Sequence, residues 1–137
     1  MLSLWGGFFH KTRRYRKDES GSATVEAVLW FPIFFYFLAL IADASLIFSG
    51  ETRALRIVQD GNRAFAVGKL TSISAAESFI ESRLSQLSPS VTVVTTVNNG
   101  VVSSTATMPV SELSGIGIIP EFGGLFIKVT AQQLTEI

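Results

Sequence analysis

The sequence predicts an α+β protein in which a long membrane-spanning helix is followed by a second helix and a small antiparallel sheet. Three observations predict this fold: the apolar run Ala27 to Gly50, the helical spacing of charged residues after it, and Val- and Thr-rich segments on either side of Asn98 to Gly100. The expected domains are a leader over residues 1–21, a transmembrane helix over 22–50 and a folded domain over 51–137.

The apolar run is long enough to cross a membrane. As a helix its 24 residues would measure about 36 Å, against about 30 Å for a hydrocarbon core. Five basic residues precede it, and the residues that follow Gly50 are mixed in charge. Because Lys and Arg are enriched in cytoplasmic segments, we expect a single span with the amino end in the cytoplasm and the carboxyl end outside. The basic residues are Lys11, Arg13, Arg14, Arg16 and Lys17.

Two further helical segments are expected beyond the apolar run. The first is an amphipathic continuation that ends near Gly68, with Arg53, Arg56, Asp60 and Arg63 opposite Ala54, Leu55, Val58, Gly61 and Phe65. The second begins with Ser74 three residues before Glu77, the spacing of a capping box, and ends by Pro89. Its expected buried face is Phe79, Ile80, Leu84 and Leu87.

The remaining residues predict a hairpin and a carboxy-terminal strand. The hairpin strands are residues 91–97 and 101–108, and the third strand is 125–131, after a loop over 111–124. Alternate residues of a strand share a face. The expected buried row is therefore Val91, Val93, Val97, Val102, Ala106 and Met108.

Composition argues against catalysis and ligand binding. The chain has no cysteine, its single histidine is His10 in the leader, and no nucleophile, metal-ligand or phosphate-loop motif occurs. Acidic and basic residues balance at 11 each, and no basic stripe remains after Gly21. We therefore expect a protein that is not an enzyme and has no catalytic residue, cofactor, metal, nucleic-acid partner or small-molecule substrate.

A short motif joins the leader to the apolar run. Gly21 stands five residues before Glu26, and the apolar residues begin directly after that glutamate. A carboxylate in hydrocarbon is costly unless a partner neutralises it. Cleavage after Gly21 would create such a partner, the Ser22 α-amine, one helical turn from Glu26 or presented by a neighbouring subunit. We expect Gly21 and Ser22 to be a processing site and Glu26 to pair with that amine during assembly.

Two other residues stand out within the expected span. Pro32 removes one helical hydrogen bond and can bend or loosen the helix. Asp43 lies near the outer boundary, where two interpretations are open. It is either an acid in the membrane interface, where it costs little, or a polar contact between packed membrane helices.

Four features of the chain together carry a family resemblance: the segment Gly21-Ser-Ala-Thr-Val-Glu26, the pair Phe31-Pro32, Asp43, and the stretch Arg53 to Val67. Over roughly residues 18–68, the chain resembles the TadE-like pseudopilins of bacterial tight-adherence (Flp) pilus systems. The resemblance implies cleavage by a prepilin peptidase and a minor, assembly-promoting role in the pilus and in cell adhesion. It also implies an inner-membrane protein with a periplasmic domain, whose partners are other pilins or pseudopilins and the inner-membrane assembly platform. The sister TadF type fits equally.

Two alternatives remain open. Ala42-Asp43-Ala44 matches the small-x-small rule of ordinary signal peptidase, which would release a periplasmic domain beginning at Ser45. Alternatively the chain stays uncleaved, as a single-pass anchor that carries a binding domain. The amino-terminal residue of the mature protein separates these alternatives.

Overall fold

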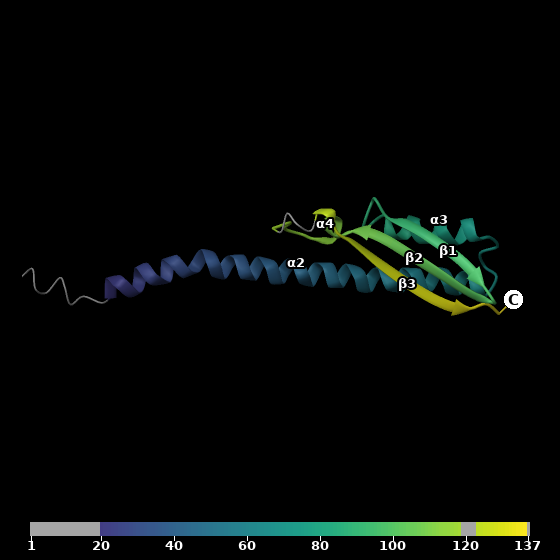
Figure 1. Ribbon diagram of the computed structural model, residues 1–137, viewed down its shortest axis with the longest axis horizontal. Helices are drawn as coiled ribbons and strands as arrows, with labels where there is room; N and C mark the ends of the chain where they lie inside the picture. Colours follow the sequence, from purple (N-terminus) through teal and green to yellow (C-terminus); the bar gives the residue numbers. More distant parts are fainter. Residues whose placement is uncertain (1–19, 119–122, 137) are drawn as a thin grey trace, which may run out of the picture. The chain divides into compact units, whose positions relative to one another are not determined.

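The computed structural model describes residues 20–118 and 123–136. These residues form a long helix, two shorter helices and a three-stranded sheet, which confirms the expected α+β class (Figure 1). The predicted leader lies outside the described residues except for its last two positions. The elements are α2 (Ser20–Ala66), α3 (Ile73–Leu84), β1 (Thr92–Asn98), β2 (Val101–Pro109), α4 (Val110–Leu113) and β3 (Phe126–Leu134).

The chain divides into two compact units, residues 1–38 and 39–137. In the first unit the described residues belong to α2, and their large apolar side chains are exposed from Val25 to Leu38. Within the described part of the chain, α2 is the helix that is long and apolar enough to cross a membrane. An exposed apolar surface of this length is what a lipid-facing helix requires.

In the second unit α2 is amphipathic, as predicted. Ala54 and Val58 are fully buried, whereas Arg56 and Asp60 are exposed. The helix ends at Ala66, and Gly68 follows with a φ of +80°. The Gly68 N–H donates to the Phe65 carbonyl at 3.0 Å, so a left-handed residue ends the helix where the sequence predicts.

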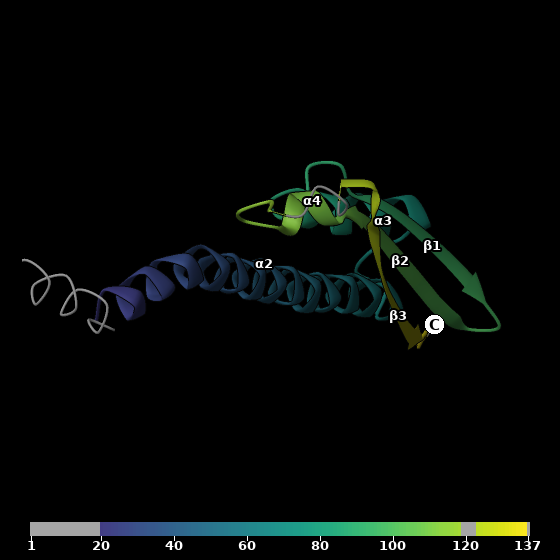
Figure 2. The same ribbon diagram turned by 60° about the vertical axis from the view of Figure 1, so that its left-hand side comes forward.

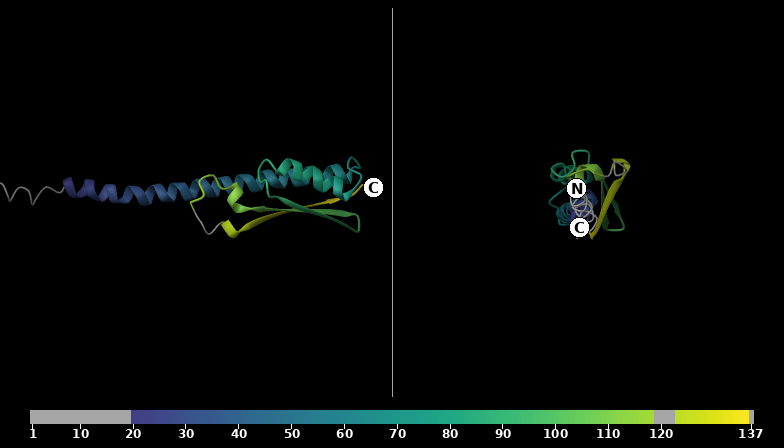
Figure 3. Two further views of the ribbon diagram at one scale, coloured as in Figure 1. Left: turned by 90° about the horizontal axis from the view of Figure 1, so that it is seen from above. Right: turned by 90° about the vertical axis from the view of Figure 1, so that its left-hand side faces the viewer.

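The α3 helix packs beside the second half of α2 on one face of the sheet (Figure 3). Gly61 permits this close approach, because a Cβ at that position would lie 2.4 Å from Cγ1 of Ile80. Ile80 and Leu84 are fully buried, as expected, and Phe79 and Leu87 pack against the core from its edge.

The predicted capping box of α3 is wrong. The N-cap is Ser72, whose Oγ accepts from the Ala75 N–H at 3.1 Å. Glu77 instead accepts the Thr95 N–H of β1 at 2.7 Å, and Glu81 accepts the Val93 N–H at 3.3 Å. The Glu77 carboxylate, which the sequence predicts to cap its own helix, therefore binds the backbone of β1 instead.

The strands are ordered β1-β2-β3, and both pairings are antiparallel (Figure 2). Asn99 and Gly100 have φ of +52° and +78°, so the hairpin turns where the sequence predicts. The third strand is longer than expected, because Gln132 to Leu134 also pair with β2. The predicted loop over 111–124 is also wrong at its start, where α4 buries Val110 and Leu113 on one face.

The predicted buried row is mostly confirmed. Val93, Val102, Ala106 and Met108 are buried, and Val91 is half-buried. Val97 is 38% exposed, contrary to prediction. It lies near the hairpin end of an edge strand, at the margin of the area that α3 covers.

Two polar residues, Thr95 and Ser104, complete the buried row, and Ser104 binds α2 directly. Ser104 donates to Oδ1 of Asn62 and lies 2.8 Å from the Thr95 hydroxyl, while Nδ2 of Asn62 donates to the Ala131 carbonyl at 2.7 Å. Asn62 is fully buried. We call these four residues the Asn62 network; it joins α2 to all three strands.

We expect Asn62→Ala to lower the stability of the sheet by about 3 kcal/mol, because it removes two hydrogen bonds and leaves buried partners unsatisfied. The measurement is hydrogen exchange of the β2 amides in the full chain in detergent micelles. Gln59→Ala, an exposed change on the same helix, serves as the control. Equal protection of β2 in both variants would contradict the assigned role of Asn62.

A second polar contact joins α4 to the segment before β1. The Ser88 hydroxyl donates to the Glu112 carboxylate, which also accepts the Ser90 N–H at 3.2 Å. These hydrogen bonds, that of the Ser88 side chain foremost, hold the pKa of Glu112 below its ordinary value. The ionised carboxylate is therefore the form that the fold stabilises.

The sign of this shift predicts a pH dependence. A depressed pKa in the folded state contributes stability above the ordinary glutamate pKa of about 4.3, and the contribution is lost as the pH falls through the folded value. We expect Glu112→Gln to lower the melting temperature at pH 7 and the difference from wild type to shrink by pH 3. Glu136→Gln, at an exposed position, is the control. A difference that does not change with pH would refute this assignment.

Candidate processing and assembly site

The predicted processing site lies in the first turn of α2. The helix begins at Ser20, so the bond between Gly21 and Ser22 is inside it, and both residues are exposed. A Cβ built on Gly21 would meet no heavy atom within 4 Å. Packing in the described residues therefore gives no reason for a glycine here.

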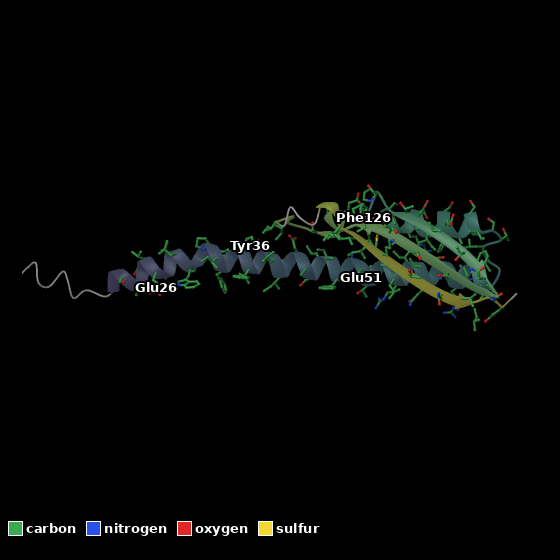
Figure 4. The ribbon with its side chains drawn as sticks, in the orientation of Figure 1. Glu26, Tyr36, Glu51 and Phe126 are labelled. Carbon is green, nitrogen blue, oxygen red and sulfur yellow. The ribbon has the colours of Figure 1, made fainter. Side chains whose placement is uncertain are left out.

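Glu26 is exposed one helical turn after Ser22 (Figure 4). Residues four apart in a helix share a face and are separated by about 6 Å along the axis. In the uncleaved chain the Ser22 nitrogen belongs to a peptide bond and carries no charge. The geometry leaves the Glu26 carboxylate accessible to a second chain, while an ammonium at Ser22 would be near enough to pair within the same chain.

Pro32 lies inside α2, and the helix continues on both sides of it. The proline has no N–H to donate to the Val28 carbonyl, so one helical hydrogen bond is missing at this position. The sequence places this residue in the exposed apolar part of the helix, and the structure agrees.

Asp43 has a role that neither sequence interpretation anticipated. Its side chain is 1% exposed, and its carboxylate accepts backbone N–H groups from Gly115 at 3.1 Å, Ile116 at 2.7 Å and Ile118 at 3.2 Å. We call this arrangement the Asp43 clasp. It fastens the loop after α4 to the long helix of the same chain.

A glycine permits the loop to approach the helix closely. A Cβ at Gly115 would lie 2.4 Å from Cδ1 of Leu46. Successive N–H groups in a glycine-containing turn form a concavity that binds anions. From the sequence alone, the glycines of this segment predict a loop. They do not show that Asp43 binds the backbone of that loop.

The comparison with known families finds a similarity, which covers most of α2. Residues 21–63 match the family model described as TadE-like protein. This segment is TadE-like. The match begins at Gly21, contains Glu26, Pro32 and Asp43, and confirms the expected resemblance over a slightly shorter range. No match is found among curated proteins or among solved structures.

The TadE-like segment ends within α2, so it covers neither α3 nor the sheet. Among the residues that the structure describes, no cluster of three or more His, Cys, Asp and Glu side chains is placed to hold a metal ion. A polar hollow of about 570 Å³ lies beside the carboxyl end of α2. It is lined by Gln59, Asp60, Arg63, Ala66, Val67, Gln132, Gln133 and Glu136.

We expect Asp43→Ala to release the loop from the TadE-like helix. Hydrogen bonds to a charged acceptor are worth about 1.5–3 kcal/mol each, so exchange of the Gly115, Ile116 and Ile118 amides should rise at least about tenfold. Hydrogen exchange of the full chain in micelles gives the measurement. Asp60→Ala, an exposed acid on the same helix, should leave these amides unchanged. Unaltered exchange in Asp43→Ala would show that the clasp does not hold the loop.

Proposed function

We propose that the protein is a minor pseudopilin, a non-catalytic subunit that promotes assembly of a bacterial tight-adherence (Tad, or Flp) pilus. One observation carries this proposal: Gly21 and Glu26 stand at the start of the TadE-like segment, directly before the exposed apolar side chains of α2. The family associates the segment with Tad pilus systems. The one candidate span among the described residues fits a membrane-anchored pilus component.

The first step of the proposed function is removal of the leader. A prepilin peptidase on the cytoplasmic side cleaves between Gly21 and Ser22, and the five bases of the leader leave with it. Cleavage requires the first turn of α2 to open. Residues 21–30 are all exposed in the structure, so local opening breaks few packing contacts.

The second step is association of membrane helices. Cleavage leaves an ammonium on Ser22 near the level of the Glu26 carboxylate. A charge in the bilayer is costly alone and less so when it is paired. Glu26 of one subunit therefore pairs with the Ser22 amine of a neighbouring pilin or pseudopilin, on the inner-membrane assembly platform, while residues 51–137 fold in the periplasm.

Cleavage after Ala44 is the alternative that the geometry opposes most directly. Asp43 would be separated from the loop that its carboxylate binds. Mass spectrometry of the membrane-extracted protein distinguishes the possibilities: a chain that begins at Ser22 supports the pseudopilin, Ser45 a secreted domain, and Met1 an uncleaved anchor.

We expect Gly21→Val to retain the leader. Because a Cβ at this position meets no neighbouring atom, a block would reflect recognition by the peptidase rather than misfolding. The matched control is Ala23→Val, the same added bulk at another exposed position in the first turns of the helix, which should be processed. The intact mass of each variant gives the result. Normal release of Ser22 from Gly21→Val would refute the processing site.

We expect Glu26→Ala to be inserted and cleaved but to abolish piliation, because the neighbouring amine loses its partner. Electron microscopy of surface fibres, together with the mass of the mature subunit, gives the measurement. Glu51→Ala, which removes an acid farther along the same helix (Figure 4), should leave fibres in place. Normal fibres from the Glu26 variant would remove its assembly role.

A further inference from the structure

Exposed apolar side chains gather at one end of the second unit. Ile116 is 56% exposed, Leu125 52% and Phe126 63%. The Ile116 N–H is held by Asp43, and the Leu125 carbonyl accepts the Val110 N–H at 3.0 Å. Two segments that are distant from α2 in sequence therefore present exposed apolar side chains; Figure 4 labels one of these, Phe126, near Glu51 along the helix.

Helix geometry places the Asp43 clasp at the outer membrane boundary. Crossing about 30 Å of hydrocarbon takes about 20 helical residues. A span that begins at Ser22 then ends at about Ile41, and one that begins at Ala27 ends at about Leu46. In either case Asp43 lies within about 5 Å of the hydrocarbon edge along the helix axis.

The Asp43 clasp satisfies backbone N–H groups of the loop at a position where little water is available to do so. Unpaired backbone N–H groups are costly where water is scarce, so irregular backbone is disfavoured there unless its polar groups are satisfied. The Asp43 carboxylate satisfies three such groups and is itself buried. The loop thereby satisfies three of its N–H groups against the helix, while the Ile116 side chain stays exposed.

We propose that the loop of residues 114–118 inserts into the outer lipid interface, with Ile116 in contact with acyl chains. The occupant of this apolar surface is lipid, because Ile116 is exposed and its N–H is bound to Asp43, which lies near the hydrocarbon edge. This second membrane contact would restrict how the whole folded domain tilts and turns relative to the membrane surface. The inference rests on the membrane placement in the proposed function but not on cleavage or on Glu26.

The test uses single-cysteine variants, which are specific because the chain has no cysteine. Full-length Ile116→Cys, Phe35→Cys and Leu134→Cys are each labelled with a nitroxide and reconstituted in phosphatidylcholine vesicles at low protein density. Collision of the label with oxygen reports lipid, and collision with a water-soluble nickel chelate reports water. Leu134 is the matched control, an apolar side chain that is 72% exposed at the far end of β3, about 26 Å along the strand from Phe126.

We expect the Ile116 label to favour oxygen, as the Phe35 label does in the span, and the Leu134 label to favour nickel. If Phe35 reports lipid but Ile116 reports water, the loop inference fails and the span stands. If Phe35 reports water, the membrane placement fails as well. An Ile116 label that is shielded from both reagents would indicate a protein contact and would also overturn the inference.

A second variant tests the role of the clasp. Adding Asp43→Ala to Ile116→Cys should move the label toward water, with at least a twofold rise in nickel collision. The Leu134 label in the same Asp43→Ala background checks the fold and should not change. An Ile116 label that stays in lipid without Asp43 would overturn the proposal that the clasp positions the loop.

Discussion

The buried amide of Asn62 is the interaction on which the arrangement of helix and sheet depends. The other contacts of α2 with the core come from small or aliphatic side chains such as Ala54 and Val58, and such contacts are not directional. Apolar contacts alone do not fix the rotation of α2 about its axis relative to the sheet. The Asn62 network removes that freedom, because its donor and acceptor must meet partners on different strands at once.

The parts of the fold that follow from local pattern were predictable from sequence. Charge spacing along α2, the left-handed residue after it and the Asn-Gly turn each depend on residues that are close in the chain. Glu77 shows where such reasoning stops. Its distance from Ser74 satisfies a capping box, but Ser72 caps α3 and Glu77 binds a strand backbone 18 residues away. The competing partner was tertiary, and no local spacing reveals it.

The candidate site divides in the same way. Gly21 and Glu26 were found by their register with the apolar run, which is a local signal, and the TadE-like match covers both. Asp43 was singled out because an acid in an apolar run is unusual, but its partners lie more than 70 residues away. A single sequence shows that such an acid needs a partner without showing which one. The intrachain clasp supplies a partner for this acid that neither interpretation of the sequence had named.

The glutamates of α3 cap one edge of the sheet, the outer side of β1. On β1 the carboxylates of Glu77 and Glu81 occupy N–H groups that would otherwise be open to another strand. Occupying these donors discourages edge-to-edge pairing with the sheet of another molecule, so the hydrogen bonds that hold α3 to β1 also protect this edge from aggregation.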